Sequence, residues 1–138
     1  MRCLTILLSR LSIARPDGPA LGAFVELLGF RSLPAWQNMF LYFQIEMENE
    51  RRGLPIDVRV DLTPISEEGG REGALAILSA TGIVQMPLNV GLPPVFTANL
   101  EIRFEFPKFG IYEVGLYLDG ELAGHRLLAI VDSTPEDG

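Results

Sequence analysis

The sequence predicts an all-β fold in which two antiparallel sheets pack face to face. Several segments alternate apolar and polar residues with the period of two that is typical of half-buried strands. An Asp-Gly pair separates two such segments, as in a two-residue hairpin turn. Glycine and proline residues separate most of the others. With 138 residues, of which 48% are hydrophobic, the chain is expected to form one domain over residues 1–132. A flexible polar tail is expected at residues 133–138.

The first two segments allow two interpretations. Residues 4–14 place leucines at helical spacing, but the same residues also alternate as a strand does. Residues 20–30 have the same ambiguity. We predict a strand in each segment, joined through the turn residues 16–19, because two isolated short helices would suit this pattern poorly.

Three later segments alternate clearly, namely residues 39–47, 56–62 and 100–106. In the first, both phases contain apolar residues, so a strand with two covered or partly covered faces is expected. Pro107 is expected to end the third strand, because proline cannot donate to a ladder of hydrogen bonds. Trp36 is placed in the connection that precedes the first of them.

The stretch at residues 66–73 is polar and rich in glycine, and it predicts a loop. Residues 74–90 are expected to hold two short strands that are interrupted at Thr81 and Gly82. Pro87 in the second of these indicates the edge of a sheet.

A hairpin is the clearest prediction. Strands are expected at residues 111–118 and from 121 to about 131, with a type I′ turn at Asp119 and Gly120, because both central positions of that turn need a positive φ. Alternation gives each strand an inner face. The residues assigned to these two faces are Tyr112, Val114, Leu116 and Leu118, and then Leu122, Gly124, Arg126 and Leu128.

The residues that open this hairpin carry a resemblance. The pattern Gly110-Ile111-Tyr112-Glu113-Val114 resembles the start of the penultimate strand in immunoglobulin-like domains. The resemblance implies an immunoglobulin-like β-sandwich of about seven to nine strands. It also implies a corner in which the hydroxyl of Tyr112 bonds to the backbone just upstream. Val114 stands where antibody domains carry a cysteine, so no antibody-type disulfide is implied.

Three motifs extend the resemblance to about residues 3–131. They are G-x-F at residues 22–24, F-P-x-x-G-x-Y at residues 106–112 and D-G-x-L at residues 119–122. In these motifs the chain resembles a family of small bacterial proteins of unknown function. The resemblance implies the fold and its turns, and it implies no catalytic residues.

Charge and cysteine content limit the partners. The net charge of −7 disfavours binding to nucleic acid or to an anionic membrane surface. Cys3 is the single cysteine, which excludes an internal disulfide and favours a reducing compartment. Arg10 interrupts the first apolar run after six residues, which is shorter than a signal peptide needs. A cytoplasmic location is therefore expected.

Four candidate sites have a structural alternative, which we favour in each case. His125 is expected at a structural or surface position, since no nucleophile motif accompanies it. Cys3 is expected to be a buried, inert thiol. Glu46, Glu48 and Glu50 form an acidic series that suits a glycosidase pair or calcium, but a solvated face paired with arginines such as Arg59 or Arg103 is expected instead. No cofactor or metal is expected.

The fourth candidate is a set of three aromatic residues, Phe40, Tyr42 and Tyr117, which alternation places on outward faces. Such a strip would suit a protein–protein interface, and the alternative is that other parts of the fold cover it. We therefore predict a non-enzymatic interaction or structural module of a bacterial, phage-like assembly, with self-association or a protein partner. The alternatives are a module that binds a small ligand or carbohydrate and, less favoured, an enzyme.

Overall fold

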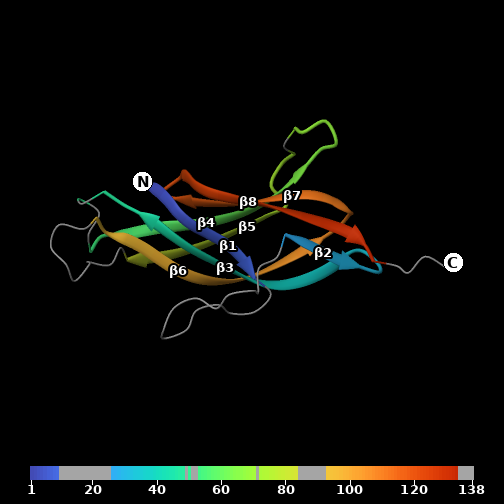
Figure 1. The fold of residues 1–138 in the computed structure, drawn as a ribbon, viewed down its shortest axis with the longest axis horizontal. Helices are drawn as coiled ribbons and strands as arrows, with labels where there is room; N and C mark the ends of the chain where they lie inside the picture. Colours follow the sequence, from blue (N-terminus) through green and yellow to red (C-terminus); the bar gives the residue numbers. More distant parts are fainter. Residues whose placement is uncertain (10–25, 49, 51–52, 71, 84–92, 134–138) are drawn as a thin grey trace.

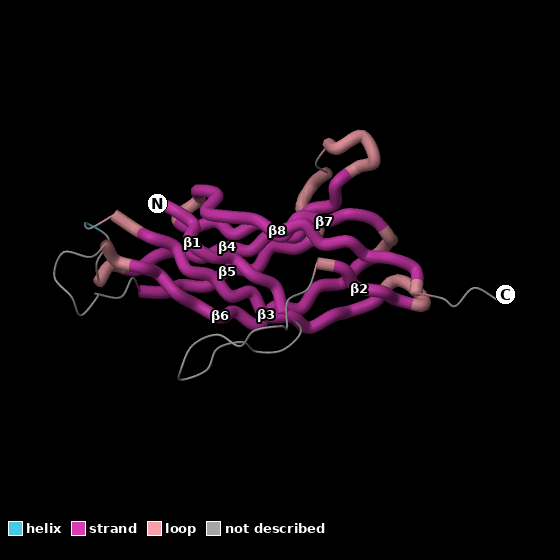
Figure 2. Tube along the Cα trace, viewed as in Figure 1, coloured by secondary structure: helices cyan, strands magenta, loops and turns pink. Residues whose placement is uncertain are grey.

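The chain forms two β-sheets in the computed structural model, which describes residues 1–9, 26–48, 50, 53–70, 72–83 and 93–133 (Figure 1). One sheet has three strands in the order β1 (Arg2–Ser9), β3 (Ala35–Glu46) and β6 (Val95–Phe106). The other has five strands in the order β2 (Leu27–Phe30), β8 (Glu121–Asp132), β7 (Gly110–Leu118), β4 (Pro55–Ile65) and β5 (Ala76–Ile83). Strands make up most of the described residues (Figure 2), so the all-β prediction is confirmed.

Neighbouring strands are antiparallel, except that β2 runs parallel to β8. The pairing of β3 with β6 is continuous from Ala35 opposite Phe106 to Glu46 opposite Val95. In the larger sheet β4 lies between β5 and β7. The described residues contain no helix with the length and apolar character that a membrane crossing requires.

The core lies between the two sheets and follows the predicted alternation. One face of each long strand is buried, and burying such a side chain contributes about 1.5–3 kcal/mol. The predicted inner residues of β7 expose 2% of their surface or less, and the same phase is buried in β3, β4 and β6. These four sets are Tyr112, Val114, Leu116 and Leu118; Met39, Leu41, Phe43 and Ile45; Ile56, Val58, Val60 and Leu62; and Ile102, Phe104 and Phe106.

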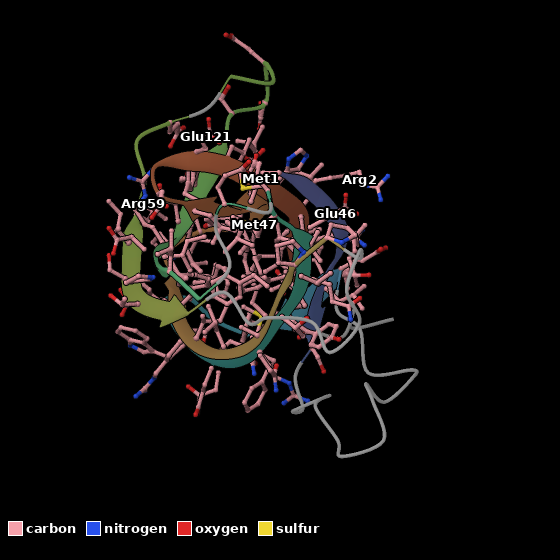
Figure 3. The ribbon with its side chains drawn as sticks, turned by 90° about the vertical axis from the view of Figure 1, so that its left-hand side faces the viewer. Met1, Arg2, Glu46, Met47, Arg59 and Glu121 are labelled. Atoms are coloured by element: carbon pink, nitrogen blue, oxygen red, sulfur yellow. The ribbon has the colours of Figure 1, made fainter. Side chains whose placement is uncertain are left out.

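Seen along the long axis of the molecule, the strands of both sheets curve around a filled interior (Figure 3). The sheets therefore meet along two seams. At the seam between β1 and β8, Arg126 Nε donates a hydrogen bond of 2.6 Å to the main-chain oxygen of Ile6. Gly124 allows the close approach there, because a Cβ at this position would lie 3.1 Å from Sγ of Cys3. The other seam, between β5 and β6, forms part of the site described below.

Some predicted elements differ from the structure. The strand predicted at residues 4–14 is confirmed over residues 4–9, where β1 lies, and the one predicted at 20–30 is confirmed at Leu27–Phe30. The turn at 16–19 and the other residues of 10–25 lie outside the described residues, as does Pro87. The interruption predicted at Thr81 and Gly82 was wrong, because β5 runs through both residues. The second short strand predicted there falls mainly on residues 84–90, which lie outside the described residues.

Two further corrections concern single residues. Trp36 belongs to β3 rather than to a connection, because β3 begins at Ala35 and pairs Trp36 with Glu105. Leu122 faces outward and is 43% exposed. The register shifts between Leu116 and Tyr117, which pair with Gly124 and Leu122, so Ala123 is an extra residue. Such a bulge reverses the alternation on one side of it, and the inward face predicted for Leu122 was therefore wrong.

Candidate interaction site

The three aromatic residues predicted as an interface do not form one exposed surface. Phe40 and Tyr42 lie on the outward side of β3, in the three-stranded sheet, whereas Tyr117 lies on β7 in the other sheet. Tyr42 is only 6% exposed, because the register places it between Leu7 of β1 and Asn99 of β6. Tyr42 lies on the outward side as predicted, but its side chain is covered, as the favoured alternative has it.

Two arginines, the half-buried Arg59 and the exposed Arg103, cover aromatic rings on the outward faces. The guanidinium carbon of Arg59 lies 4.3 Å from the centroid of the Tyr117 ring. The guanidinium carbon of Arg103 lies 4.8 Å from the centroid of the Trp36 ring. Cation–π contacts of this kind stabilise by about 0.5–1 kcal/mol at exposed sites. One face of each ring is therefore already in contact with a charged group of the chain itself.

Two members of the acidic series, at and just after the end of β3, contact the first two residues of the chain. Glu46 accepts a 2.7 Å hydrogen bond from Arg2, and the two side chains lie side by side in Figure 3. Glu48 accepts one of 2.7 Å from the amino group of Met1. The expected partners Arg59 and Arg103 were wrong, because Arg59 lies on β4 in the other sheet and Arg103 lies opposite Asn38, at the other end of the β3–β6 pairing from Glu46. Glu50 is exposed.

Cys3 and His125 lie at exposed positions. The prediction that Cys3 is buried was wrong, because residue 3 lies near the start of β1, an outer strand of its sheet. Partial burial still raises the pKa of the Cys3 thiol above its ordinary 9.0, and the nearby charge of Arg126 opposes this shift. His125 lines a hollow of ≈ 430 Å³ together with Glu26, Ile111 and Leu127. The described residues contain no group of three or more His, Cys, Asp or Glu that could hold a metal ion.

The predicted corner and turn residues hold the two ends of β7. At one end the hydroxyl of Tyr112 donates a 2.6 Å hydrogen bond to the main-chain oxygen of Lys108, and Gly110 has a φ of 141°. At the other end Asp119 and Gly120 have φ values of 49° and 84°, as a type I′ turn requires. These contacts fix the backbone at both ends of β7, which is an architectural role.

A second hollow, of ≈ 690 Å³, lies under the loop between β4 and β5, which stands out from the two sheets (Figure 1). Its walls carry Glu67, Glu68 and Glu72 from the loop, and Lys108 and Phe109 from the turn before β7. Lys108 Nζ lies 3.5 Å from a carboxylate oxygen of Glu72. This ion pair is exposed on both sides, so it contributes only about 0–1 kcal/mol.

The seam between β5 and β6 is the third candidate and has a different character. Among the described strands, β5 pairs with β4 alone and β6 with β3 alone, so each presents an edge at this seam. A hollow of ≈ 250 Å³ lies between them. It is lined almost entirely by apolar or uncharged side chains, with Glu101 as its single charged residue: Val58, Val60, Leu78, Ser79, Ala80, Leu100, Glu101 and Ile102.

Over the described residues, the edge strand β5 carries no charge, proline or bulge that would oppose pairing. Natural edge strands carry charges, prolines or bulges that prevent another strand from adding to them. The eight residues of β5, Ala76-Ile77-Leu78-Ser79-Ala80-Thr81-Gly82-Ile83, include no charge and no proline. Its register with β4 is regular over its whole length. Ile77 is 58% exposed although it is one of the largest apolar side chains of the strand.

The direction of the backbone groups on β5 follows from the neighbouring turn. The main-chain oxygen of Asp57 accepts a 2.8 Å hydrogen bond from the N–H of Asp119, and the N–H of Asp57 donates one of 2.8 Å to Oδ1 of Asp119, so the backbone groups of Asp57 point toward β7. The backbone N–H and C=O groups of Val58 and Val60 therefore point toward β5, where these residues pair with Ala80 and Leu78. The backbone groups of the alternate residues Ile77, Ser79 and Thr81 consequently point to the open edge.

Sequence reasoning missed this edge, although one signal was present. No charged side chain occurs between Ala74 and Leu100, a stretch that includes β5 and the first half of β6. The order of the strands decides which of them is an edge, and local alternation does not carry that order.

Comparison with known proteins adds little. No family model matches the chain, and no curated protein matches it. One solved structure with some similarity is the Pseudomonas fluorescens alkylpurine DNA glycosylase AlkC bound to DNA containing an abasic site analog, at 12% sequence identity and a TM-score of 0.44. The match covers 94% of this chain but spans only 30% of that protein. A likeness at this level carries no argument about function.

Proposed function

We propose that this chain is a non-enzymatic protein–protein interaction module, and that a strand of a protein partner adds to the open edge of β5. The observation that carries the proposal is the uncharged, proline-free edge beside an apolar hollow. In β-strand addition, the main chain supplies affinity and pockets for alternate side chains supply specificity. Here the outward backbone groups of Ile77, Ser79 and Thr81 would supply the affinity, and the hollow beside Leu78 would supply the specificity.

We propose in addition that the sandwich is immunoglobulin-like. The order β8-β7-β4 corresponds to the G, F and C strands of that fold, and β1-β3-β6 corresponds to A, B and E. The hydrogen bond from Tyr112 to Lys108 supports this assignment, since a tyrosine corner is a hallmark of the fold. Constant-type domains place a further strand, D, beside E. None of the described strands takes that place beside β6, which agrees with an open seam.

The alternative of a carbohydrate-binding module has weaker support. Sugars bind to exposed ring faces of aromatic residues, and those of Trp36 and Tyr117 are each covered on one side by an arginine. Phe109 is 40% exposed and lines the hollow under the loop between β4 and β5. The other aromatic residue of that hollow, Tyr112, is buried, so Phe109 is the one exposed ring among its described residues.

The test compares two substitutions at one position of the edge. Ser79→Pro removes an N–H that points away from β4, so the ladder inside the sheet stays intact while an added strand loses a hydrogen bond. Ser79→Ala removes the same side chain but keeps the N–H. The tagged full-length chain and both variants are used to capture partners from extracts of the source cells, with unfolding temperatures measured in parallel.

We expect that the wild type and Ser79→Ala retain a partner protein, and that a folded Ser79→Pro variant does not. Hydrogen exchange at Ile77, Ser79 and Thr81 should slow when this protein binds. A partner that Ser79→Pro still holds, with unchanged exchange at these amides, would show that binding takes place elsewhere.

A further inference from the structure

We infer that the strand added at this seam comes from a second copy of the same chain, an inference that rests on the proposed function. Two copies related by a two-fold axis would pair β6 with β6 and β5 with β5, each antiparallel. Both sheets would then continue across the dimer. Backbone direction, charge and the position of the hollow support this arrangement.

Backbone direction limits the registers available to β6. The N–H of Met47 donates a 2.8 Å hydrogen bond to the main-chain oxygen of Pro94, so this oxygen points toward the side on which β3 lies. Alternation then directs the backbone groups of residues 96, 98, 100, 102 and 104 toward β3. Those of Asn99, Glu101, Arg103 and Glu105 point to the open edge. Only registers that place these residues opposite one another allow a symmetric ladder between two copies of β6.

Charge selects among those registers. With the axis at Ile102, Glu101 of each copy lies opposite Arg103 of the other, which gives two attractive pairs. With the axis at Arg103, two arginines face each other and Glu101 faces Glu105, and like charges directly opposite are destabilising. With the axis at Phe104, Arg103 faces Glu105, but the two strands then overlap only over residues 102–106, because β6 ends at Phe106, whereas the axis at Ile102 lets residues 98–106 overlap. The axis at Ile102 is therefore favoured.

The hollow shows that β5 can pair about the same axis. It places Leu78, Ser79 and Ala80 beside Leu100, Glu101 and Ile102, so the middle of β5 lies next to the axis position on β6. An axis near Ser79 puts Ile77 opposite Thr81 of the second copy and leaves no charge on either edge of β5. Each copy would cover the seam of the other, including the partly buried side chains of Leu78 and Leu100.

The dimer is tested on the purified full-length chain by light scattering after size-exclusion chromatography, over a range of concentrations. Wild type is expected to approach twice the monomer mass of 15.2 kDa. Glu101→Arg places two arginines opposite each other, and Arg103→Glu places two glutamates there. Each should raise the dissociation constant by about tenfold or more, because two pairs change from attractive to repulsive. The exchange of both residues, Glu101→Arg with Arg103→Glu, should restore the dimer.

Glu101→Arg leaves the contact of Arg103 with Trp36 in place, so a change in its mass reports on the interface rather than on that contact. Ser79→Pro should weaken the dimer, and Ser79→Ala should not. A wild-type chain that stays monomeric at every concentration overturns the inference, as does a dimer that both single charge changes leave intact. If such a monomer still captures another protein through the β5 edge, the proposed function stands and only the second copy is wrong.

Discussion

The hydroxyl of Tyr112 donates a 2.6 Å hydrogen bond to the main-chain oxygen of Lys108. The ring of Tyr112 is 1% exposed and packs edge-on against Phe106, with the two centroids 5.2 Å apart. A single side chain thus connects the turn between β6 and β7 to the core. The turn carries Gly110 with a positive φ, so the hydrogen bond holds a conformation that the backbone alone would not favour.

Replacing Tyr112 by Phe is expected to lower the free energy of unfolding by about 0.5–1.5 kcal/mol, because the ring stays and one hydrogen bond is lost. Urea unfolding followed by circular dichroism measures the change. Tyr117→Phe serves as the matched control, since it keeps the ring on which Arg59 lies and should change stability by only a few tenths of a kcal/mol. Equal losses in the two variants would contradict a special role for the corner.

Tyr112 should also make stability depend on alkaline pH. Burial raises the pKa of its hydroxyl above the ordinary 10.0, and the positive charge of Lys108 offsets part of this effect. A group with a raised pKa in the folded state stabilises the fold fully below its unfolded pKa, and the contribution is lost as pH rises through the folded pKa. The unfolding temperature should therefore fall as pH rises above about 10, and Tyr112→Phe should remove part of that fall. Parallel curves for the two proteins would contradict this prediction.

The hairpin turn is tied to β4 by the side chain of Asp119. Its Oδ1 accepts a 2.8 Å hydrogen bond from the N–H of Asp57, and its own φ is 49°. Asp119→Ala should destabilise by about 1–3 kcal/mol, because a bond is lost and alanine tolerates positive φ poorly. Asp119→Asn keeps both an acceptor oxygen and tolerance of this conformation, so its loss should be well under half as large. Denaturant unfolding compares the two, and equal losses would show that the carboxylate charge matters instead.

The faces of the long strands could be predicted because alternation reports burial directly. Met39 and Val58 lie in the core as expected, since a strand with one buried face repeats its apolar residues every second position. Leu122 could not be placed correctly, because the bulge at Ala123 adds one residue without any break in the pattern. The partner of Glu46 was missed for another reason. It depends on β1 lying beside β3, which is a long-range property of the strand order.

The candidate site has the same limits. The sequence contains the uncharged run that forms β5, but Gly82 within it suggested an interruption of the strand. The aromatic residues drew attention because exposed rings are common at interfaces. Whether Tyr42 is exposed depends on two neighbouring strands, and whether β5 is open depends on which strands lie beyond it. Neither property follows from the local pattern.

The seam between β1 and β8 gives a last prediction, on the reactivity of Cys3. Burial raises the pKa of this thiol above 9.0, while the positive charge of Arg126 lowers it. Arg126→Gln removes the charge, so the pKa of Cys3 should rise further and the thiolate fraction at a fixed pH near 8 should fall. The rate of alkylation by iodoacetamide, measured from pH 7 to 10, gives this pKa directly.

Arg126→Lys is the matched variant, because it keeps the charge but cannot reproduce the guanidinium hydrogen bond to Ile6. Both substitutions remove that bond and should lower stability by about 1–3 kcal/mol. Only Arg126→Gln should raise the pKa of Cys3 clearly. If the two variants shift it equally, the seam has opened and exposure of the thiol controls its reactivity. If neither shifts it, Arg126 does not act on Cys3.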